Sequence, residues 1–495
     1  MSLYQGKLLH LILLERFGPI VADVGKALFE FPRSLFHVRK TTGFPLLKVK
    51  ESLSILIKFN LASFKLNHDG TTATYRLIID NILLMLRYPK FINLIKMKME
   101  DEAETLVEEL LYKGCSTASE LIIKTATRLK ENKDIGTLLK QLKDKFASLV
   151  TAKYFIRLKN ANTQEQELFA VPTIDLKQLS SIMNGSDETP ADESIYWTLN
   201  PDRFHQDLRD QLVVNAVTNK FDENTGELMR IFLQQMYIRT SPWVPVSNLI
   251  PVLEVKDIVK KQKTHPQLLA FFDQYVNILE QDGNNIIQKA GEASGGSFQI
   301  EMKKIFTQLT WEIMEQLVNE KFDTKASRIF RLVKCRRYIE PEEIQHLVMM
   351  PSKEVKRITY QLFEENFVLL NELKRSITNS GPNKSFTLFY IQLTQLVRTT
   401  LELSYKTLFN IMTRRHHEKF LNKRIIDKKQ RVDTISMGMR VQGASVDQLT
   451  DIEEMITPPE AEALAKIGKM MKKLNVAELE IDDTIFLLQM YLAYE

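Results

Sequence analysis

One pattern of secondary-structure signals constrains the fold of this chain more than any other, because it recurs four times along 495 residues. Each copy takes roughly 80 residues and contains amphipathic helices, a turn, a further helix and two alternating segments typical of a β-hairpin. This is the order of elements in the winged helix, a variant of helix-turn-helix. The sequence therefore predicts a mainly α fold with small β-hairpins, arranged as tandem winged-helix domains.

The first copy contains every part of this pattern. Residues Thr42–Pro45 predict a turn, because they include a glycine and a proline, the strongest local breakers of regular structure. A third helix is expected over Leu46–Asn60, where apolar residues recur at helical spacing. The alternating segments Leu61–Leu66 and Ala73–Ile78 follow, with a hairpin turn at His68–Gly70. We expect these two segments to form the wing.

The other copies keep the same order of elements. Their third helices are expected over Ile135–Val150, Pro266–Leu279 and Ser352–Asn366. The second copy opens with a long helix over Tyr88–Lys113, and the third has a wing turn in the Gly-rich stretch Gly291–Gly296. Winged helices are therefore expected along the chain as far as residue 391.

The junction between third helix and wing is the most specific part of the repeat. In the first and fourth copies a charged helix end is followed by an asparagine, Asn60 or Asn366, and then by an apolar strand start. Asparagine tolerates the left-handed conformation that ends many helices. Lys153–Leu158 is a weaker third instance. We expect Asn60 and Asn366 to be left-handed C-caps.

These signals divide the chain into six segments. They are a first winged helix over 1–80, a second over 81–160, a linker over 161–195, a third winged helix over 196–300, a fourth over 301–391, and a C-terminal helical hairpin or coiled coil over 392–495. The linker is predicted from its polar composition and from a cluster of turn-forming residues.

The last segment lacks the wing pattern. Apolar residues recur from Ile391 to Arg431 without a convincing breaker, and Gly438 and Gly443 are expected to flank a turn. Another helix is expected to end near Lys473, and a final helix is expected over Asp482–Tyr494. An antiparallel helical hairpin packed on the body of the protein is the predicted arrangement.

Catalytic and metal-binding motifs are missing from the sequence. It contains no phosphate-binding GxxxxGK[ST] loop, no GxGxxG after a strand, no GxSxG and no HExxH. Cys115 and Cys335 have no ligand-type spacing around them, and His416-His417 has no further ligand nearby. We therefore expect no catalytic residues, no metal site and no cofactor.

Clustered basic residues are the main chemical signal. The net charge is only +5, since 67 basic residues face 62 acidic ones, so the charge permits nucleic-acid contact without demanding it. The candidate DNA-binding residues form a cluster within ten positions and a pair on the third helix of the first copy: Arg328, Arg331, Lys334, Arg336, Arg337, Lys48 and Lys50. Such side chains engage phosphates without reading sequence.

A second basic cluster lies on the long helix of the last segment. It is predicted to dock onto a partner protein, and consists of Arg414, Arg415, Lys419, Lys423 and Arg424. For both clusters the alternative is a solvated helix face, or salt bridges to an acidic protein surface. A protein that bound DNA tightly by itself would be more basic, so DNA contact is expected to be weak and shared with partners.

The amino terminus and the cysteine content bear on the compartment. The apolar stretch Met1–Phe17 is interrupted by charged residues, which argues against a signal peptide. No segment approaches the roughly 18 uncharged apolar residues of a membrane span. With two isolated cysteines, we expect a soluble intracellular protein in a reducing compartment, without a membrane partner.

Nine spaced motifs resemble one known family, the largest subunits of the RNA polymerase III-specific initiation heterotrimer, which are relatives of the alpha subunit of general transcription factor E. The motifs are Met85–Pro89, Tyr196-Trp197, Asp202–Gln206, Arg209-Asp210, Ala326–Val333, Glu365–Phe367, Gln430–Val432, Ile452–Thr457 and Asp483–Leu488. The resemblance covers nearly the whole chain. A match at many spaced positions is far more specific than any single motif.

The resemblance implies a non-catalytic nuclear protein built from winged helices around a C-terminal coiled coil. Members of this family sit on the clamp of RNA polymerase III with two smaller heterotrimer subunits, and help to form and hold the open promoter complex. Melted or single-stranded promoter DNA would be a further partner, in transcription of transfer RNA and other short genes. One departure is that Asn160–Glu193 is short, where family members carry a longer, charged insertion.

Two other classes of protein fit the same repeats. A free-standing winged-helix DNA-binding regulator would need a dimer interface and symmetric half-sites. A winged-helix protein-interaction scaffold would usually carry a long array of helix pairs before a single winged helix, whereas hairpin signals here begin in the first copy. Footprinting by the isolated protein separates the first class from a polymerase subunit.

Overall fold

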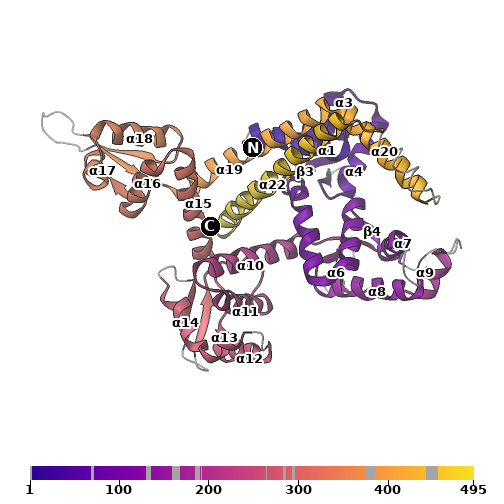
Figure 1. Ribbon diagram of the computed structural model, residues 1–495, viewed down its shortest axis with the longest axis horizontal. Coiled ribbons are helices and arrows are strands. Elements are labelled where there is room, and N and C mark those ends of the chain that lie inside the picture. Colours follow the sequence, from indigo (N-terminus) through magenta and orange to yellow (C-terminus); the bar gives the residue numbers. More distant parts are fainter. Residues whose placement is uncertain are drawn as a thin grey trace. The chain divides into compact units, whose positions relative to one another are not determined.

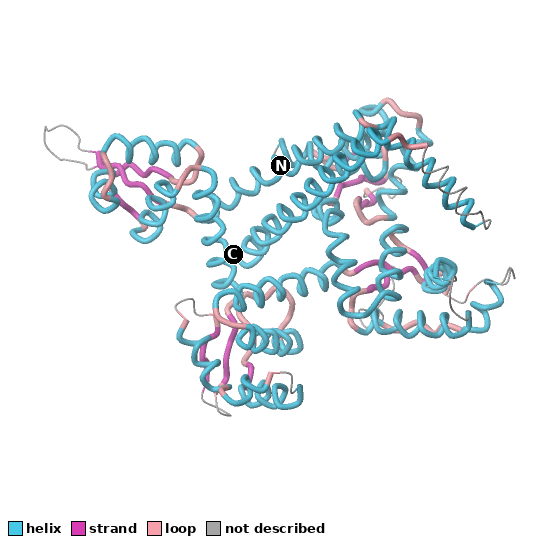
Figure 2. Tube along the Cα trace, viewed as in Figure 1, coloured by secondary structure: helices cyan, strands magenta, loops and turns pink. Residues whose placement is uncertain are grey.

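The computed structural model describes residues 3–67, 72–129, 135–158, 168–183, 190, 192–262, 265–282, 286–291, 296–374, 385–441 and 455–495 (Figure 1). Helices dominate, and the strands are short (Figure 2). The chain forms two compact units. The first comprises Met1–His205 and Tyr405–Asp482, and the second comprises Gln206–Ser404 and Asp483–Glu495. The predicted mainly α fold with small hairpins is confirmed.

Four antiparallel sheets share one topology, which identifies the four repeats as winged helices. In each, a two-residue strand pairs with the last strand of the repeat, which also pairs with the middle strand; the orders are β1-β3-β2, β4-β6-β5, β7-β9-β8 and β10-β12-β11. The strands are β1 Arg33–Ser34, β2 Ala62–Leu66, β3 Ala73–Leu77, β4 Ser116–Thr117, β5 Phe155–Arg157, β6 Tyr196–Leu199, β7 Ile250–Pro251, β8 Ile287–Gly291, β9 Ser297–Ile300, β10 Tyr338–Ile339, β11 Leu369–Lys374 and β12 Ser385–Tyr390.

Winged helix 1 packs four helices against its sheet. They are α1 Leu3–Phe17, α2 Pro19–Leu28, α3 Leu35–Thr42 and α4 Leu46–Lys58. Gly18 separates α1 from α2 with a left-handed φ of 88°. A Cβ atom on Gly25 would lie 2.5 Å from the terminal Cδ1 of Leu13, so a larger residue there would require the Leu13 side chain to shift. The expected turn and third helix are present; the expected hairpin turn at His68–Gly70 lies outside the described residues.

Winged helix 2 differs from the prediction in its first helix. Its helices are α5 Ile79–Leu84, the 3-10 turn η1 Met85–Arg87, α6 Tyr88–Lys113, α7 Ala118–Leu129, α8 Ile135–Thr151 and α9 Leu176–Met183. The long helix α6 is broken at Glu100, whose φ is 72°. The Lys145 ammonium stabilises the break, donating to the Met99 carbonyl at 3.1 Å and to the Glu100 carboxylate at 2.8 Å.

The last strand of winged helix 2 comes from Tyr196–Leu199, residues that the sequence pattern assigns to winged helix 3. Strand β6 pairs with both β4 and β5, so Tyr196–Leu199 completes the second sheet. The Trp197 ring is buried there, 5.5 Å from that of Phe146. Part of the expected linker is also packed: Leu179 of α9 is buried, and Asp192 accepts a 2.8 Å hydrogen bond from the Ser119 amide. The chain between β5 and β6 is therefore more than a linker.

Winged helices 3 and 4 follow the predicted order. Their helices are α10 Pro201–Lys220, α11 Glu223–Arg239, α12 Val252–Gln262, α13 Pro266–Ala270 and α14 Phe272–Gln281 in the third, and α15 Met302–Lys321, α16 Thr324–Arg336, α17 Pro341–Val348 and α18 Ser352–Glu364 in the fourth. The helix expected over Pro266–Leu279 is interrupted at Phe271, which separates α13 from α14. Of the Gly-rich turn between β8 and β9, residues 292–295 lie outside the described residues.

The junctions between third helix and wing confirm the predicted caps. Asn60 and Asn366 have φ of 55° and 61°, and Lys153 occupies the same position in winged helix 2 with φ of 65°. After each, the next amide donates back to a carbonyl five residues earlier, as from Leu61 to Leu56 and from Phe367 to Leu362, both at 2.8 Å. This six-to-one hydrogen bond is the Schellman ending of a helix.

Among the described residues, the C-terminal segment contains α19 Leu393–Leu421, α20 Lys423–Val441 and α22 Pro458–Tyr494. The stretch Ile391–Arg431, in which no breaker is predicted, is divided at Asn422 between α19 and α20. The expected end near Lys473 is wrong, since α22 runs unbroken to Tyr494. Gly438 lies inside α20 and does not flank a turn, while Gly443 is outside the described residues. A helix tolerates a single glycine at a cost of about 1 kcal/mol.

Candidate nucleic-acid and partner interfaces

The basic cluster of winged helix 4 divides into exposed and internally paired cations. Arg328 and Arg336 lie on the exposed face of α16, and Arg337 directly follows the helix with φ of 65°. The opposite face of α16 is buried through residues such as Phe330 and Val333. Among the described residues, Arg331 and Lys334 form ion pairs with Glu315, whereas Arg328, Arg336 and Arg337 form none.

Arg331 and Lys334 both bind one carboxylate of their own winged helix. The Arg331 Nε donates to Glu315 at 2.8 Å, and the Lys334 Nζ donates to it at 2.7 Å. Burial would raise the pKa of Glu315, but the hydrogen bonds from Lys334 and Arg331 outweigh it and lower the pKa below its usual value. Lys334 also lies 4.9 Å from the ring centre of Trp311. Part of the predicted DNA-binding charge is therefore neutralised within the protein.

The third helix of winged helix 4 carries a basic face that the sequence analysis missed. Lys353, Lys356 and Arg357 are exposed on α18, and Tyr360 is 56% exposed one turn further. Their spacing places all four on one side of the helix. The periodicity of the predicted helix contained this signal, because these positions alternate with the buried Val355, Ile358 and Thr359.

Winged helix 1 presents a mixed surface on the equivalent helix. Lys48 and Lys50 are exposed on α4, as predicted. They stand beside apolar side chains that are also exposed, Leu47 at 69% and Ile55 at 37%. A surface of this composition is less suited to a phosphate backbone than the basic face of α18.

The third helices of winged helices 2 and 3 present fewer exposed cations than α18: of the three lysines of α8, only Lys140 is exposed. In α8, Lys143 donates to the Ile174 carbonyl at 2.7 Å, and Lys145 is held at the break in α6. Helix α14 contains no lysine or arginine. The four winged helices therefore share a topology but not a surface.

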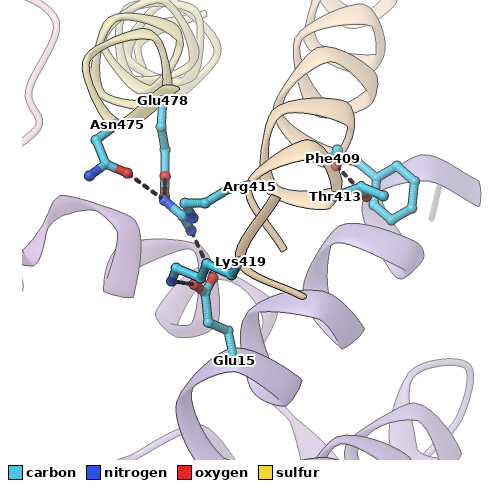
Figure 3. A network of polar contacts seen from close by, with 7 residues as sticks. All are labelled: Glu15, Phe409, Thr413, Arg415, Lys419, Asn475 and Glu478. Carbon is cyan, nitrogen blue, oxygen red and sulfur yellow. Dashed lines mark hydrogen bonds and ion pairs between the residues drawn. The ribbon is translucent and has the colours of Figure 1, made fainter. Parts of the chain in front are cut away.

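Within the second basic cluster, Arg415 is an internal residue (Figure 3). Its guanidinium donates to Glu15 of α1 at 2.7 Å and to Asn475 of α22 at 3.1 Å, and it also pairs with Glu478. Its side chain is only 12% exposed. Lys419 adds a 3.3 Å contact to Glu15. The expected role of Arg415 in partner docking is not supported, because its charge links three helices of the first compact unit.

The electrostatics of this network follow from burial. Burial would raise the pKa of Glu15, but Arg415 and Lys419 hold it below its usual value. Burial raises the pKa of Glu478 despite its contact with Arg415. The network borders a cavity of about 700 Å³ that is also lined by apolar residues such as Met85, Met412 and Met471.

The remaining cations of the second cluster face solvent. Arg414 is 59% exposed and pairs with Glu418 at 2.6 Å on its own helix. Lys423 and Arg424 are exposed at the start of α20. They border a hollow that also contains Phe420 and Leu421.

A buried polar cluster joins two of the motifs on which the resemblance rests, Met85–Pro89 and Asp202–Gln206, to the residue before a third, Asp482. Asp482 accepts from Arg87 at 3.0 Å and from Lys90 at 2.9 Å, and the Arg87 guanidinium lies 3.3 Å from His205 Nε2. Burial, assisted by the charge of Arg87, lowers the pKa of His205 to about 4. Within the first compact unit, these contacts connect η1 and the start of α6 to the first turns of α10 and to Asp482 of α22.

The described part of the chain also bears on metal binding and on membrane insertion. Among the described residues, no three histidine, cysteine or acidic side chains come together as a metal site would require. Within the same residues, no helix combines the length and the apolar character needed to cross a bilayer.

Sequence models of four related families match successive parts of the chain. The helix-turn-helix domain of RNA polymerase III subunit RPC82 matches residues 7–67, and RNA polymerase III subunit RPC82 itself matches 155–309. The POLR3C C-terminal winged-helix domain matches 314–391. The helical hairpin domain of DNA-directed RNA polymerase III subunit RPC3 matches 424–487.

Curated relatives extend the similarity over nearly the whole chain. The protein named DNA-directed RNA polymerase III subunit RPC3 in Homo sapiens is 32% identical over 98% of this chain and 98% of its own length. Its counterpart in Danio rerio is 29% identical over 99% of both chains. One from Dictyostelium discoideum is 22% identical over 61% of this chain and 44% of its own. These matches confirm the resemblance drawn from the spaced motifs: the chain belongs to the RPC3 family of DNA-directed RNA polymerase III subunits.

Proposed function

We propose that this chain is a non-catalytic, nuclear subunit of RNA polymerase III that acts in promoter-dependent initiation and open-complex formation. It docks a heterotrimer, with two smaller subunits, on the clamp of the largest polymerase subunit. It also contacts melted promoter DNA weakly. Membership of the RPC3 family supports the polymerase assignment, because relatives matching 98% of the chain carry that name.

The observation that supports the DNA contact is the set of exposed basic side chains on two helices of winged helix 4. Arg328, Arg336 and Arg337 come from α16 and its end, and Lys353 and Arg357 come from α18. Lysine and arginine side chains of this kind bind phosphates through charge and counterion release. Tyr360 adds an exposed ring on which a base can stack.

Charge reversal tests the DNA contact. The variant Arg328→Glu, Arg336→Glu, Arg337→Glu is expected to bind a single-stranded oligonucleotide at least tenfold more weakly and to lower open-complex yield in reconstituted transcription. The control is Lys466→Glu, Lys469→Glu, Lys472→Glu on α22, which makes the same change in net charge. Equal losses in the two variants, or no loss in the first, would refute the assignment.

Docking on the polymerase is expected to involve winged helices 2 and 3. Internally bound lysines on α8 and the lack of basic residues on α14 favour protein packing by winged helices 2 and 3. Co-purification of the tagged chain tests the assembly. RNA polymerase III core subunits should be recovered with it from nuclear extract, and their absence would contradict the proposal.

A further inference from the structure

The hollow at the junction of α19 and α20 has an apolar floor and a basic rim. The helices are separated by Asn422, whose amide donates to the Glu418 carbonyl at 3.2 Å and whose carbonyl accepts from Ile425 and Ile426. One helix therefore ends and the next begins within a single residue. This arrangement leaves Phe420 and Leu421 at the end of α19 beside the first turns of α20.

The floor of this hollow is unusually exposed for apolar side chains. Phe420 is 71% exposed, Leu421 62%, Ile435 48% and Met455 58%, and all four line one depression of about 980 Å³. Single exposed apolar residues are normal on a protein surface, but a group gathered in one hollow marks a binding surface. Val432 completes the floor and is buried.

The rim is basic. Lys423, Arg424, Lys428 and Arg431 line the hollow, against the single carboxylate of Asp427. Lys428 is paired with Glu460 at 2.6 Å. Within the described residues, no ion pair involves the other three cations of the rim. Their charge is therefore available to a binding partner.

From this combination we infer that the hollow binds an acidic, amphipathic segment of another polymerase subunit, with its apolar side chains on the floor and its carboxylates against the rim. The inference rests on the proposed function, and it names the kind of partner that the hairpin takes. Charge complementarity sets the sign of the partner. Methionine and leucine side chains adapt to a peptide's apolar face.

Two other occupants fit the chemistry less well. A single-stranded nucleic acid would satisfy the rim but would find only one aromatic side chain, Phe420, for base stacking. A second copy of this chain, placed by a two-fold axis, would bring the same basic rim against itself. Both become outcomes of the test.

A photo-crosslinking amino acid at Leu421 in the intact chain, assembled into RNA polymerase III in cells, tests the inference. The expected product joins Leu421 to a polymerase subunit at a segment in which acidic and apolar residues alternate, identified by mass spectrometry. Crosslinks to nucleic acid, to a second copy or to a segment without acidic residues would overturn it, as would no crosslink from polymerase that contains the labelled chain.

Separate substitutions test the contributions of the apolar floor and of the basic rim to binding. With the crosslinker moved to Ile435, both Phe420→Ser with Leu421→Ser and Lys423→Glu with Arg424→Glu are expected to lower the crosslink yield at least fivefold. The matched control is Lys429→Glu with Lys469→Glu, two exposed lysines that do not line the hollow. If wild type recovers the polymerase but neither variant loses the crosslink, this inference fails alone; if wild type recovers no polymerase, the proposed function fails.

Discussion

Winged helices 2 and 4 have the same sheet order and the same cap after their third helix, yet they use that helix in opposite ways. In winged helix 2, Lys143 and Lys145 of α8 bind backbone carbonyls of neighbouring segments. In winged helix 4, Lys353, Lys356 and Arg357 of α18 face solvent. The winged-helix topology therefore provides a scaffold, and the exposed side chains of its third helix determine what it can bind.

The largest expected effect tests whether the two modules have separate cores. Phe146 in winged helix 2 and Phe330 in winged helix 4 are both fully buried. Substitution of either by alanine should cost about 3–5 kcal/mol of unfolding free energy, from lost burial and the cavity left behind. Hydrogen exchange should report faster opening confined to the substituted winged helix. If Phe146→Ala lost affinity for single-stranded DNA while winged helix 4 remained protected from hydrogen exchange, the proposed difference between the two winged helices would be wrong.

The next largest effect is expected from charge reversal on the third helices, α18 of winged helix 4 and α8 of winged helix 2. The variant Lys353→Glu, Lys356→Glu, Arg357→Glu should weaken binding of a single-stranded oligonucleotide at least tenfold, about 1.4 kcal/mol or more, and flatten its salt dependence. The matched reversal in winged helix 2 is Lys140→Glu, Lys143→Glu, Lys145→Glu. It should lower stability, because it removes the contacts of α8 to Ile174 and Met99, and leave affinity within twofold.

A smaller effect on DNA affinity is expected from Glu315 of winged helix 4. Glu315→Gln removes the carboxylate that Arg331 and Lys334 share, so both cations become available and affinity for a single-stranded oligonucleotide should rise two- to fivefold. The pKa of Glu315 is lowered. The stability from its ion pairs is therefore present above the ordinary glutamate pKa and lost as pH falls through the lower folded value. Unchanged affinity in titrations at neutral pH would mean that these cations do not reach DNA.

The smallest effect on stability is expected from the left-handed C-cap residues, Lys153 in winged helix 2 and Asn366 in winged helix 4. Lys153 holds a left-handed φ of 65° that costs a residue with a Cβ atom roughly 1 kcal/mol, whereas Asn366 adopts 61° more readily. Lys153→Gly should stabilise winged helix 2 by about 0.5 kcal/mol, and Asn366→Gly should change winged helix 4 less. Urea denaturation of the two variants measures the difference; a larger gain at Asn366 would contradict this reading of the junction.

Much of the fold followed from local sequence signals. Helical periodicity, turn residues and the asparagine caps act over a few residues, so the four repeats and the left-handed Asn60 and Asn366 could be predicted. The break at Glu100 could not, because the Lys145 side chain that stabilises it comes from another helix. The place of Tyr196–Leu199 in the second sheet depends on pairing across a long intervening segment.

The candidate sites were predicted less completely, for a related reason. Clustering along the sequence identified Arg328 and Arg336 as exposed cations, but it could not show that Arg415 is paired with Glu15, which lies 400 positions away. The contact of Asp482 with Arg87 spans 395 positions. A count of charges along one helix therefore overestimates the charge available to partners.

The central claim is that winged helix 4, and not winged helix 2, lies against promoter DNA. Photo-crosslinkers placed at Tyr360 on α18 and at Lys140 on α8, in open complexes assembled on a labelled promoter, test it most directly. We expect DNA crosslinks from Tyr360 and none from Lys140. Crosslinks from Lys140 alone, or none from Tyr360 in complexes that contain the labelled subunit, would contradict it.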